Sequence, residues 1–239
     1  MGQADEGLAE DFAAIARLLQ AEATPELTQY QITRTAIDLI GGCDHAAISL
    51  ILRRGGVHTV AATDDVAVRV AEIQYDTGQG PCLDALSGLG TSVIDDLASD
   101  GRWPVFSRRT VAETGVRSML SFQLFVQGET IGALNLYSRR PAAFDLHGRV
   151  VGTVLAAHAA IALTAAQERK HVQNLEEALR SNREIGIAMG VLMARHGLTE
   201  YEAFTELRRA SQYLNVKLRG VAARVVETGR LPERRKHRN

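Results

Sequence analysis

The spacing of apolar residues divides the chain into a mixed first part and a helical last part. Near the N-terminus, apolar residues at helical spacing predict a first helix: Leu8, Phe12, Ile15, Leu18 and Leu19. Thr24 suits an N-cap and Pro25 suits the first helical position, so a second helix is expected to begin there. The Gly41-Gly42 pair predicts the end of this helix.

Short apolar runs typical of β-strands replace the helical spacing after residue 42. They predict strands over 45–52, 57–62, 92–94, 116–126 and 130–137. Helices are expected between these strands, after the caps Asp64 and Asp65, over 83–86 and over 103–113. The long strand pair carries apolar residues on both alternating sides, which favours a sheet largely buried on both faces. Helices flanking an antiparallel sheet predict an α+β fold class.

From Asp145 onward the pattern is helical, and a seven-residue repeat runs through it. Its two rows are 154, 161, 168, 175, 182 and 158, 165, 172, 179, 186. Glu168 and Asn182 interrupt the apolar seam, and a polar residue at such a position can fix register at some cost in stability. The repeat predicts a long, coiled-coil-like linking helix that pairs with a second copy in a homodimer. The alternative is that this helix packs back on its own domains.

Two shorter helices are predicted to close the chain. Residues 199–202 have the sequence of a capping box, which predicts a helix start at Thr199. The last helix is expected to begin near Asn215, and Gly229 and Pro232 supply stop signals. Together with the end of the long helix, these segments predict a C-terminal three-helix bundle.

Apolar and small residues in these helices predict the packing of the bundle. Phe204 and Leu207 lie at core spacing. Ala188 and Gly190 are small, and we expect them to allow close approach of neighbouring helices rather than contact with a ligand.

Charge separates the two parts of the chain further. The sequence has a net charge of −1, yet residues 171–239 hold 13 Lys/Arg and 8 Asp/Glu, a surplus of +5, which leaves −6 for the rest. Such an asymmetry indicates that the C-terminal part meets a polyanion. The alternative is that the surplus is only a solvated tail, 234–238.

Composition and motifs exclude several classes of protein. With 46% apolar and 23% charged residues, the chain is typical of a globular protein, and its apolar runs are too short to predict a membrane span. The first residues lack the basic region of a secretory signal, and two cysteines form no disulfide framework, so a cytoplasmic location is expected. No hydrolase, metalloprotease or dinucleotide motif is present, so we expect neither catalysis nor a cofactor nor a bound metal.

Two segments resemble known families. Residues 10–165 resemble a GAF domain through the turn 78–82, the strand 131–137 and Phe144-Asp145. Residues 175–231 resemble an ANTAR domain, and residues 232–239 follow as a basic tail. The ANTAR-like positions are Leu175, Ala178, Leu179, Ile185, Ala188, Gly190, Leu192, Met193, Ala203, Phe204, Leu207, Arg208, Asn215, Lys217, Leu218, Ala222 and Val226. The resemblance implies a dimeric antitermination module that binds a two-hairpin RNA.

The sequence departs from the ANTAR pattern at two positions that often carry cations. Asn182 stands where the family often has Arg, and Met189 stands where it often has Lys. Because phosphate contacts supply much of the affinity for nucleic acids, the departures predict weaker RNA binding or the use of Arg183 and Arg195 instead.

Candidate RNA contacts are the basic, aromatic and amide side chains of the C-terminal part. They are Arg180, Arg183, Arg195, Arg208, Arg209, Tyr213, Asn215, Lys217 and Arg219. Hairpin loops are commonly bound by aromatic rings that stack on bases and by cations that hold phosphates. For any single Arg the alternative is a solvated surface charge, and for Asn215 it is a helix N-cap.

In the first domain the candidates are fewer. Cys82 follows the Gly-rich turn and is either a reactive thiol or, more commonly, a packed one. His45 and His158 have no partner at metal-ligand spacing and are expected to be structural. The GAF resemblance implies a pocket for an unknown small-molecule ligand. Two other hypotheses remain: the C-terminal helices dock on a protein partner, or the protein is a small-molecule or redox sensor with another output.

Overall fold

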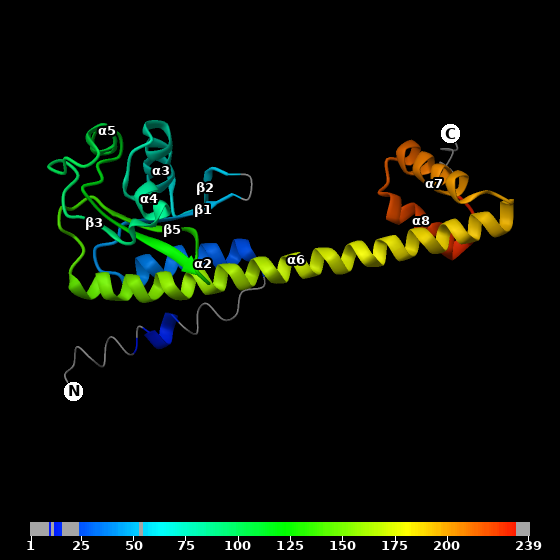
Figure 1. Ribbon diagram of the computed structural model, residues 1–239, viewed down its shortest axis with the longest axis horizontal. Helices are drawn as coiled ribbons and strands as arrows, with labels where there is room; N and C mark the ends of the chain where they lie inside the picture. The colour runs from blue at the N-terminus through cyan, green and yellow to red at the C-terminus, as the bar shows by residue number, and fades with distance from the viewer. Residues whose placement is uncertain (1–9, 11, 16–23, 53–54, 233–239) are drawn as a thin grey trace, which may run out of the picture. The chain divides into compact units, whose positions relative to one another are not determined.

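The computed structural model describes residues 10, 12–15, 24–52 and 55–232 (Figure 1). Residues 12–15 are helical and Ile15 is buried, but Leu8, Leu18 and Leu19 of the predicted first helix lie outside the described residues. The predicted basic tail also lies outside them, apart from Pro232. The chain forms two compact units, residues 1–170 and 171–239, which we call the sensory unit and the helical unit.

The sensory unit is an antiparallel five-stranded sheet with helices on both faces, which confirms the α+β prediction (Figure 1). The strand order is β2-β1-β5-β4-β3. The strands are β1 (His45–Ile51), β2 (Val57–Ala62), β3 (Ser92–Ile94), β4 (Ser118–Val126) and β5 (Glu129–Ser138). The helices are α2 (Pro25–Leu39), α3 (Asp65–Thr77), α4 (Pro81–Asp84), the π-helix η1 (Ala85–Leu89), α5 (Pro104–Thr114) and the start of α6 (Leu146–His196).

Local capping explains where α2 and α3 begin. Thr24 accepts a hydrogen bond from the Leu27 amide, and Asp64 accepts one from the Ala67 amide, as predicted. The start of α5 is different because Trp103, its N-cap residue, offers no capping side chain. The Oε1 atom of Gln79 instead accepts from the amides of the first turn of α5, at 3.2 Å for Val105.

The predicted helix over 83–86 was placed too late. The helix begins at Pro81, which suits the first helical position, and Gly80 before it has φ 139°, a conformation that favours glycine. A π-helix then runs from Ala85 to Leu89. The first turn is held by Gln74 of α3, whose Oε1 accepts from the Cys82 amide at 2.9 Å.

The two faces of the sheet differ in polarity. Even-numbered residues of β1, β4 and β5 point to α2 and α6 and form an apolar core; they include Ile48, Phe122, Leu134 and Leu136. Helices α3, α4 and α5 cover the opposite face of the sheet (Figure 1). On that face, buried polar side chains lie in the middle of the sheet. Asn135 and Ser121 are cross-strand neighbours there.

Helix α6 passes a test of length and composition for membrane spans. One 18-residue window has a mean hydropathy of 1.6, and 44% of that window is buried. The apolar residues Val151, Leu155 and Leu163 of α6 belong to the core cluster on the sheet. A core helix of this kind gives the same signal, so the hydropathy of α6 is weak evidence for a membrane span.

The helical unit contains the end of α6 with α7 (Glu200–Leu214) and α8 (Leu218–Thr228). The capping box is confirmed, because Thr199 and Glu202 exchange both side-chain-to-backbone hydrogen bonds. Gly229 ends α8 in the left-handed conformation, as its stop signal predicts. The core of the unit is aliphatic and consists of Ala188, Leu192, Ala203, Leu207, Val221, Ala222 and Val225.

Three predictions for the helical unit are wrong. Phe204 is 39% exposed, because it lies beside the buried face of α7 rather than on it. A Cβ at Gly190 would have no atom within 4 Å, so this glycine allows no close packing within the chain. Asn215 is not an N-cap: it ends α7 in the left-handed conformation at φ 53°, and α8 begins three residues later.

Candidate nucleic-acid interface and sensory core

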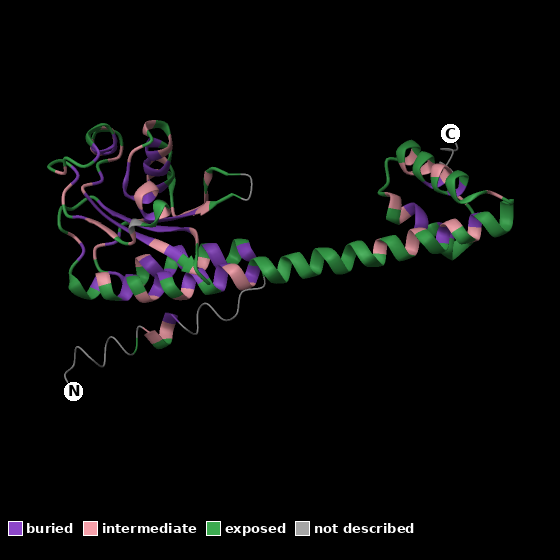
Figure 2. Ribbon diagram, viewed as in Figure 1, coloured by how far each residue is buried: buried purple, intermediate pink, exposed green. Residues whose placement is uncertain are grey.

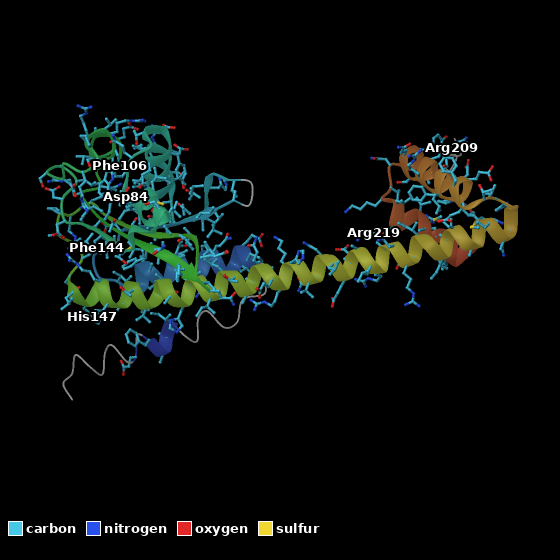
Figure 3. All side chains as sticks on the ribbon, in the orientation of Figure 1. Asp84, Phe106, Phe144, His147, Arg209 and Arg219 are labelled. Atoms are coloured by element: carbon cyan, nitrogen blue, oxygen red, sulfur yellow. The ribbon has the colours of Figure 1, made fainter. Side chains whose placement is uncertain are left out.

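Exposed basic side chains lie on α7, opposite the face that packs in the core. Ala203 and Leu207 are buried, and this places Arg208 and Arg209 in solvent. Tyr213, one turn after Arg209, is 70% exposed. An open ring beside guanidinium groups is an arrangement that stacks on bases and holds phosphates. Figure 3 shows Arg209 on the outer side of α7.

The turn between α7 and α8 adds an amide and a further cation. Asn215 and Lys217 are both exposed. The backbone amide of Asn215, not its side chain, caps α7 by donating to the Gln212 oxygen at 3.3 Å. Ser211 Oγ donates to the Val216 oxygen at 2.7 Å and fixes the turn. The carboxamide of Asn215 therefore takes no part in the cap.

A second group of predicted residues meets where α8 passes α6. Arg180 and Arg219, from different helices, line a shallow depression of about 200 Å³ together with Glu177, Ser181 and Glu184. Arg219, labelled in Figure 3, forms an ion pair with Glu177. This ion pair was not predictable from the sequence, because the two residues are 42 positions apart. The depression is electrically balanced, with two cations and two carboxylates.

The remaining two candidate arginines have different surroundings. Arg195 Nη1 donates to the Gly229 oxygen at 3.3 Å, at the C-terminal end of α8 where the helix dipole is negative. This contact gives Arg195 a structural role. Arg183 is exposed on α6, as is Asn182, whereas Met189 packs against the core of the helical unit. The apolar side chain at position 189 thus contributes to folding.

Cys82 is a packed thiol in the interior of the sensory unit. It is fully buried, and Asn135 Nδ2 donates to its Sγ at 3.3 Å. Asn135 in turn accepts from Ser121. Burial raises the pKa of the Cys82 thiol, while hydrogen bonds from Asn135 and Ser49 oppose part of the rise. A neutral, enclosed thiol is the opposite of a reactive one.

Tyr75 joins a second, partly buried hydrogen-bond group on the same side of the sheet. Its hydroxyl lies 2.8 Å from Ser49 Oγ and 2.9 Å from Thr59 Oγ1. Burial raises the pKa of the Tyr75 phenol. Residues that pair across the sheet, such as these, were missed in the sequence because serine and threonine in strands carry no distinctive pattern.

The two histidines have local partners. His45 Nδ1 lies 2.6 Å from Asp64 Oδ2, and His158 Nδ1 lies 2.9 Å from the Val154 oxygen. Among the described residues, no group of three or more His, Cys, Asp or Glu is arranged to hold a metal ion. Asp96, which follows Asp95 in the sequence, forms an ion pair with Arg117 at 2.7 Å.

The fold and these sites define a protein of two parts. The α+β unit contains buried, uncharged polar side chains, and the helical unit carries exposed basic side chains. Comparison with family models identifies both parts. A GAF domain model matches residues 22–164, and an ANTAR domain model matches residues 173–226. The chain belongs to the GAF domain family and carries an ANTAR domain after it, which confirms the resemblance. The two domains together make it a sensor-coupled regulator of the antitermination type.

Solved structures support the fold of the sensory unit. The GAF domain from a phosphoenolpyruvate-protein phosphotransferase of Coxiella burnetii has 14% identity and a TM-score of 0.55, covering 71% of this chain and 99% of that one. The corresponding Acinetobacter domain has 11% identity and a TM-score of 0.54, covering 69% and 97%. The chromophore-binding domain of a bacteriophytochrome from R. palustris has 12% identity and a TM-score of 0.52, covering 67% and 62%. A search of curated proteins found no match.

Proposed function

We propose that this protein is a cytoplasmic, signal-responsive transcription antitermination regulator that binds a two-hairpin RNA as a homodimer and catalyses no reaction. The observation that carries the proposal is the exposed cluster at the end of α7, inside the ANTAR domain. It comprises Arg208, Arg209, Tyr213, Asn215 and Lys217. Proteins that bind RNA loops commonly use an aromatic ring, an amide and basic side chains, which this cluster combines.

The middle of α6 supports the homodimer. Every residue from 167 to 180 is exposed, as the continuous green stretch of Figure 2 shows. Val172, Leu175 and Leu179 of the predicted seam are 53%, 54% and 62% exposed. A helix without tertiary contacts is marginally stable in water, and a second copy packed on this seam would supply those contacts.

A small molecule held by the GAF domain would control the dimer through α6. This helix belongs to the core of the sensory unit at its start and to the core of the helical unit at its end. A shift in the seam would change how two RNA-binding modules are presented together. Two linked contacts gain affinity through effective concentration, so their geometry acts as a switch.

The test of RNA binding is a mobility-shift titration with a transcript that carries two adjacent hairpins. The variant is Arg208→Ala/Lys217→Ala in the full chain. Loss of two phosphate contacts is expected to weaken binding about tenfold or more and to flatten the salt dependence by about one to two units of log–log slope.

A matched control removes two exposed cations from the sensory unit, Arg108→Ala/Arg139→Ala, and should leave affinity unchanged. Equal weakening in both double variants would mean that only net charge matters. Absence of binding in low salt would reject the RNA proposal and favour a protein partner for the helical unit.

The dimer is tested by Leu179→Lys, with Gln173→Lys as a control that adds the same charge off the seam. Sedimentation should give a dimer for the control and a monomer for Leu179→Lys. The monomeric variant should also bind the two-hairpin RNA more weakly, because a monomer can bind only one hairpin at a time. Unchanged affinity in a monomeric variant would rule out the two-module mechanism.

A further inference from the structure

One candidate RNA contact, Arg219, is already paired with a carboxylate of its own chain. Its guanidinium forms an ion pair with Glu177, and the two side chains are 43% and 50% exposed. Both residues belong to the helical unit, Glu177 on α6 and Arg219 on α8. Exposed ion pairs contribute little to stability, because water and salt screen them. Another anion can therefore replace Glu177 at small cost.

The position of Arg219 in α8 explains why it needs an anion. Arg219 is the second residue of α8, and Lys217, the N-cap residue, forms no capping side-chain hydrogen bond. The N-terminal end of a helix carries a partial positive charge, so a cation in the first turn is unfavourable unless an anion lies beside it. Glu177 supplies that anion here. A phosphate group of a bound RNA would meet the same requirement.

A second cation lies beside this ion pair. The depression of about 200 Å³ where α8 passes α6 is lined by Arg180 and Ser181 as well as by Glu177 and Arg219. The Arg180 guanidinium forms no ion pair with any residue that the structure describes. Guanidinium groups and hydroxyls are the donors that commonly hold phosphate oxygens. The depression therefore has the donors of a phosphate site, and one of its two guanidinium groups is occupied by Glu177.

The two carboxylates of the depression act against such a ligand in different ways. Glu177 and Glu184 balance the two cations, so the depression has no net attraction for a phosphate. Glu177 is held by Arg219, whereas Glu184 forms no ion pair within the described part of the chain. Only Glu177 therefore competes with a phosphate for a guanidinium. If its carboxylate turned away, one positive charge would remain in excess.

The depression continues the predicted RNA-binding cluster along the chain. Arg219 follows Lys217 by two residues, and Lys217 belongs to the exposed cluster at the end of α7. A nucleic-acid strand carries a phosphate at every nucleotide. A strand held at Lys217 would therefore present its next phosphates to Arg219.

We propose that the depression between α6 and α8 binds a phosphate of the RNA backbone through Arg180 and Arg219, and that Glu177 is an internal competitor for this phosphate. The inference rests on the proposed RNA binding and adds to it a site and a means of regulation. Without RNA, Glu177 holds Arg219. In the complex, a phosphate takes the place of the Glu177 carboxylate, which turns to solvent. The ion pair thus lowers the affinity for RNA.

Removal of the competitor should strengthen RNA binding. Glu177→Gln in the full chain keeps the shape of the side chain, and the mobility-shift titration with the two-hairpin transcript should give a Kd about two- to fivefold lower, the range of an exposed ion pair. Glu176→Gln is the matched control, because Glu176 is the preceding residue on α6, is exposed and does not line the depression. It removes the same charge and should leave the Kd nearly unchanged. An equal gain in both variants would mean that only net charge acts, and it overturns the proposal.

A double-mutant cycle tests whether Glu177 acts through Arg219. In an Arg219→Gln background, Glu177→Gln should give no gain in affinity, because the group for which it competes is absent. A gain of the same size there would mean that Glu177 acts without Arg219, and the proposal fails. Arg180→Gln should weaken binding and lower the log–log salt slope by about one unit. An unchanged slope would remove Arg180 from the phosphate site and overturn the proposal as well.

Thermal unfolding followed by circular dichroism separates binding from folding. Glu177→Gln loses an exposed ion pair, so its helical transition should fall by about 4 °C or less while its RNA affinity rises. Weaker RNA binding by this variant would show that the ion pair supports the bound form, and the proposal is then wrong. If the wild-type protein binds the transcript and Glu177→Gln binds no better than Glu176→Gln, the competitor is rejected and RNA binding stands. If the wild-type protein binds no transcript in low salt, the proposed function fails and this site fails with it.

Discussion

The sensory unit buries polar side chains in its interior, whereas the helical unit carries them on its surface. In the sensory unit, Ser49, Gln74, Cys82, Ser121 and Asn135 are buried in the interior. In the helical unit, all seven buried residues of the core are aliphatic. Its basic side chains at the end of α7 and the carboxamide of Asn215 are exposed to solvent.

This difference matches the size of what each unit is expected to bind. A small molecule can be enclosed, and an enclosed site needs polar groups that fold with the core. An RNA hairpin is too large to enclose, so its contacts stand on an aliphatic scaffold that only has to be rigid. Changes in the interior should therefore alter the sensory unit, and changes on the surface should alter binding by the helical unit without loss of stability.

Alkaline pH should produce the largest difference in stability between the two units, because it deprotonates thiol and phenol groups in the interior of the sensory unit. Burial raises the pKa of Cys43 to about 12 from 9.0, and it also raises the pKa values of Tyr75, Cys82 and Tyr137. Acids with raised native pKa values stabilise the fold fully below their unfolded pKa, and this contribution is lost as the pH rises. The sensory unit should unfold between pH 9 and 12.

Trp103 is the single tryptophan and lies in the sensory unit, so its fluorescence follows that unit alone. Circular dichroism at the helical band follows both units. We expect the fluorescence transition to precede the loss of the last helical signal. Coincident transitions would mean that the buried acids do not distinguish the units. The variant Cys43→Ala should move the fluorescence midpoint to higher pH.

Leu207→Ala should give the next largest effect, this time confined to the helical unit. Leu207 is fully buried in a core of seven residues, and truncation of such a leucine costs about 2–5 kcal/mol. Thermal unfolding followed by circular dichroism should show an early helical transition, while Trp103 fluorescence stays unchanged. The neighbouring exposed variant Arg208→Ala is the control. A parallel shift in the Trp103 transition would show that the units unfold together.

The fold was largely predictable where local sequence decides it. Thr24, Asp64 and Thr199 cap their helices as predicted, because the capping side chain and its target amide are only three residues apart. Capping by distant residues was not predictable. Gln79 caps α5 across 26 positions, and Arg195 reaches the end of α8 across 34.

The candidate site was predictable in composition but not in arrangement. The exposure of Arg208, Arg209 and Tyr213 follows from the spacing of buried residues on α7. The ion pair of Arg219 and the structural contact of Arg195 required knowledge of how three helices pack. Some buried hydroxyls of the sensory unit, such as those of Ser107 and Thr110, have no hydrogen-bond partner among the described residues. This was not predictable, because the sequence alone does not show which groups a serine or threonine meets in the fold.

Thr199→Ala should have a smaller effect, about 1 kcal/mol, through loss of the capping box of α7. Thr205→Ala on the same helix is the control. The hydrogen bonds from Thr199 lower the pKa of Glu202, so the cap should weaken as the pH falls through this native pKa. Chemical denaturation of the helical unit at pH 7 and at acidic pH measures both changes. A Thr199→Ala variant as stable as Thr205→Ala would mean that the capping box contributes nothing.

Asn215→Gly should change stability least, and it thereby separates an effect on RNA binding from an effect on folding. Asn215 has φ 53°, a conformation that glycine adopts at least as well, so the free energy of unfolding should change by only about 0.5 kcal/mol or less. The carboxamide is lost, however, and RNA affinity should fall about tenfold if it contacts a base, in line with roughly 1–3 kcal/mol for a specific base contact. The mobility-shift titration and the denaturation curve are measured on one preparation. Unchanged affinity would mean that asparagine serves at this position for its backbone alone, and the predicted interface would then consist of the cations and Tyr213.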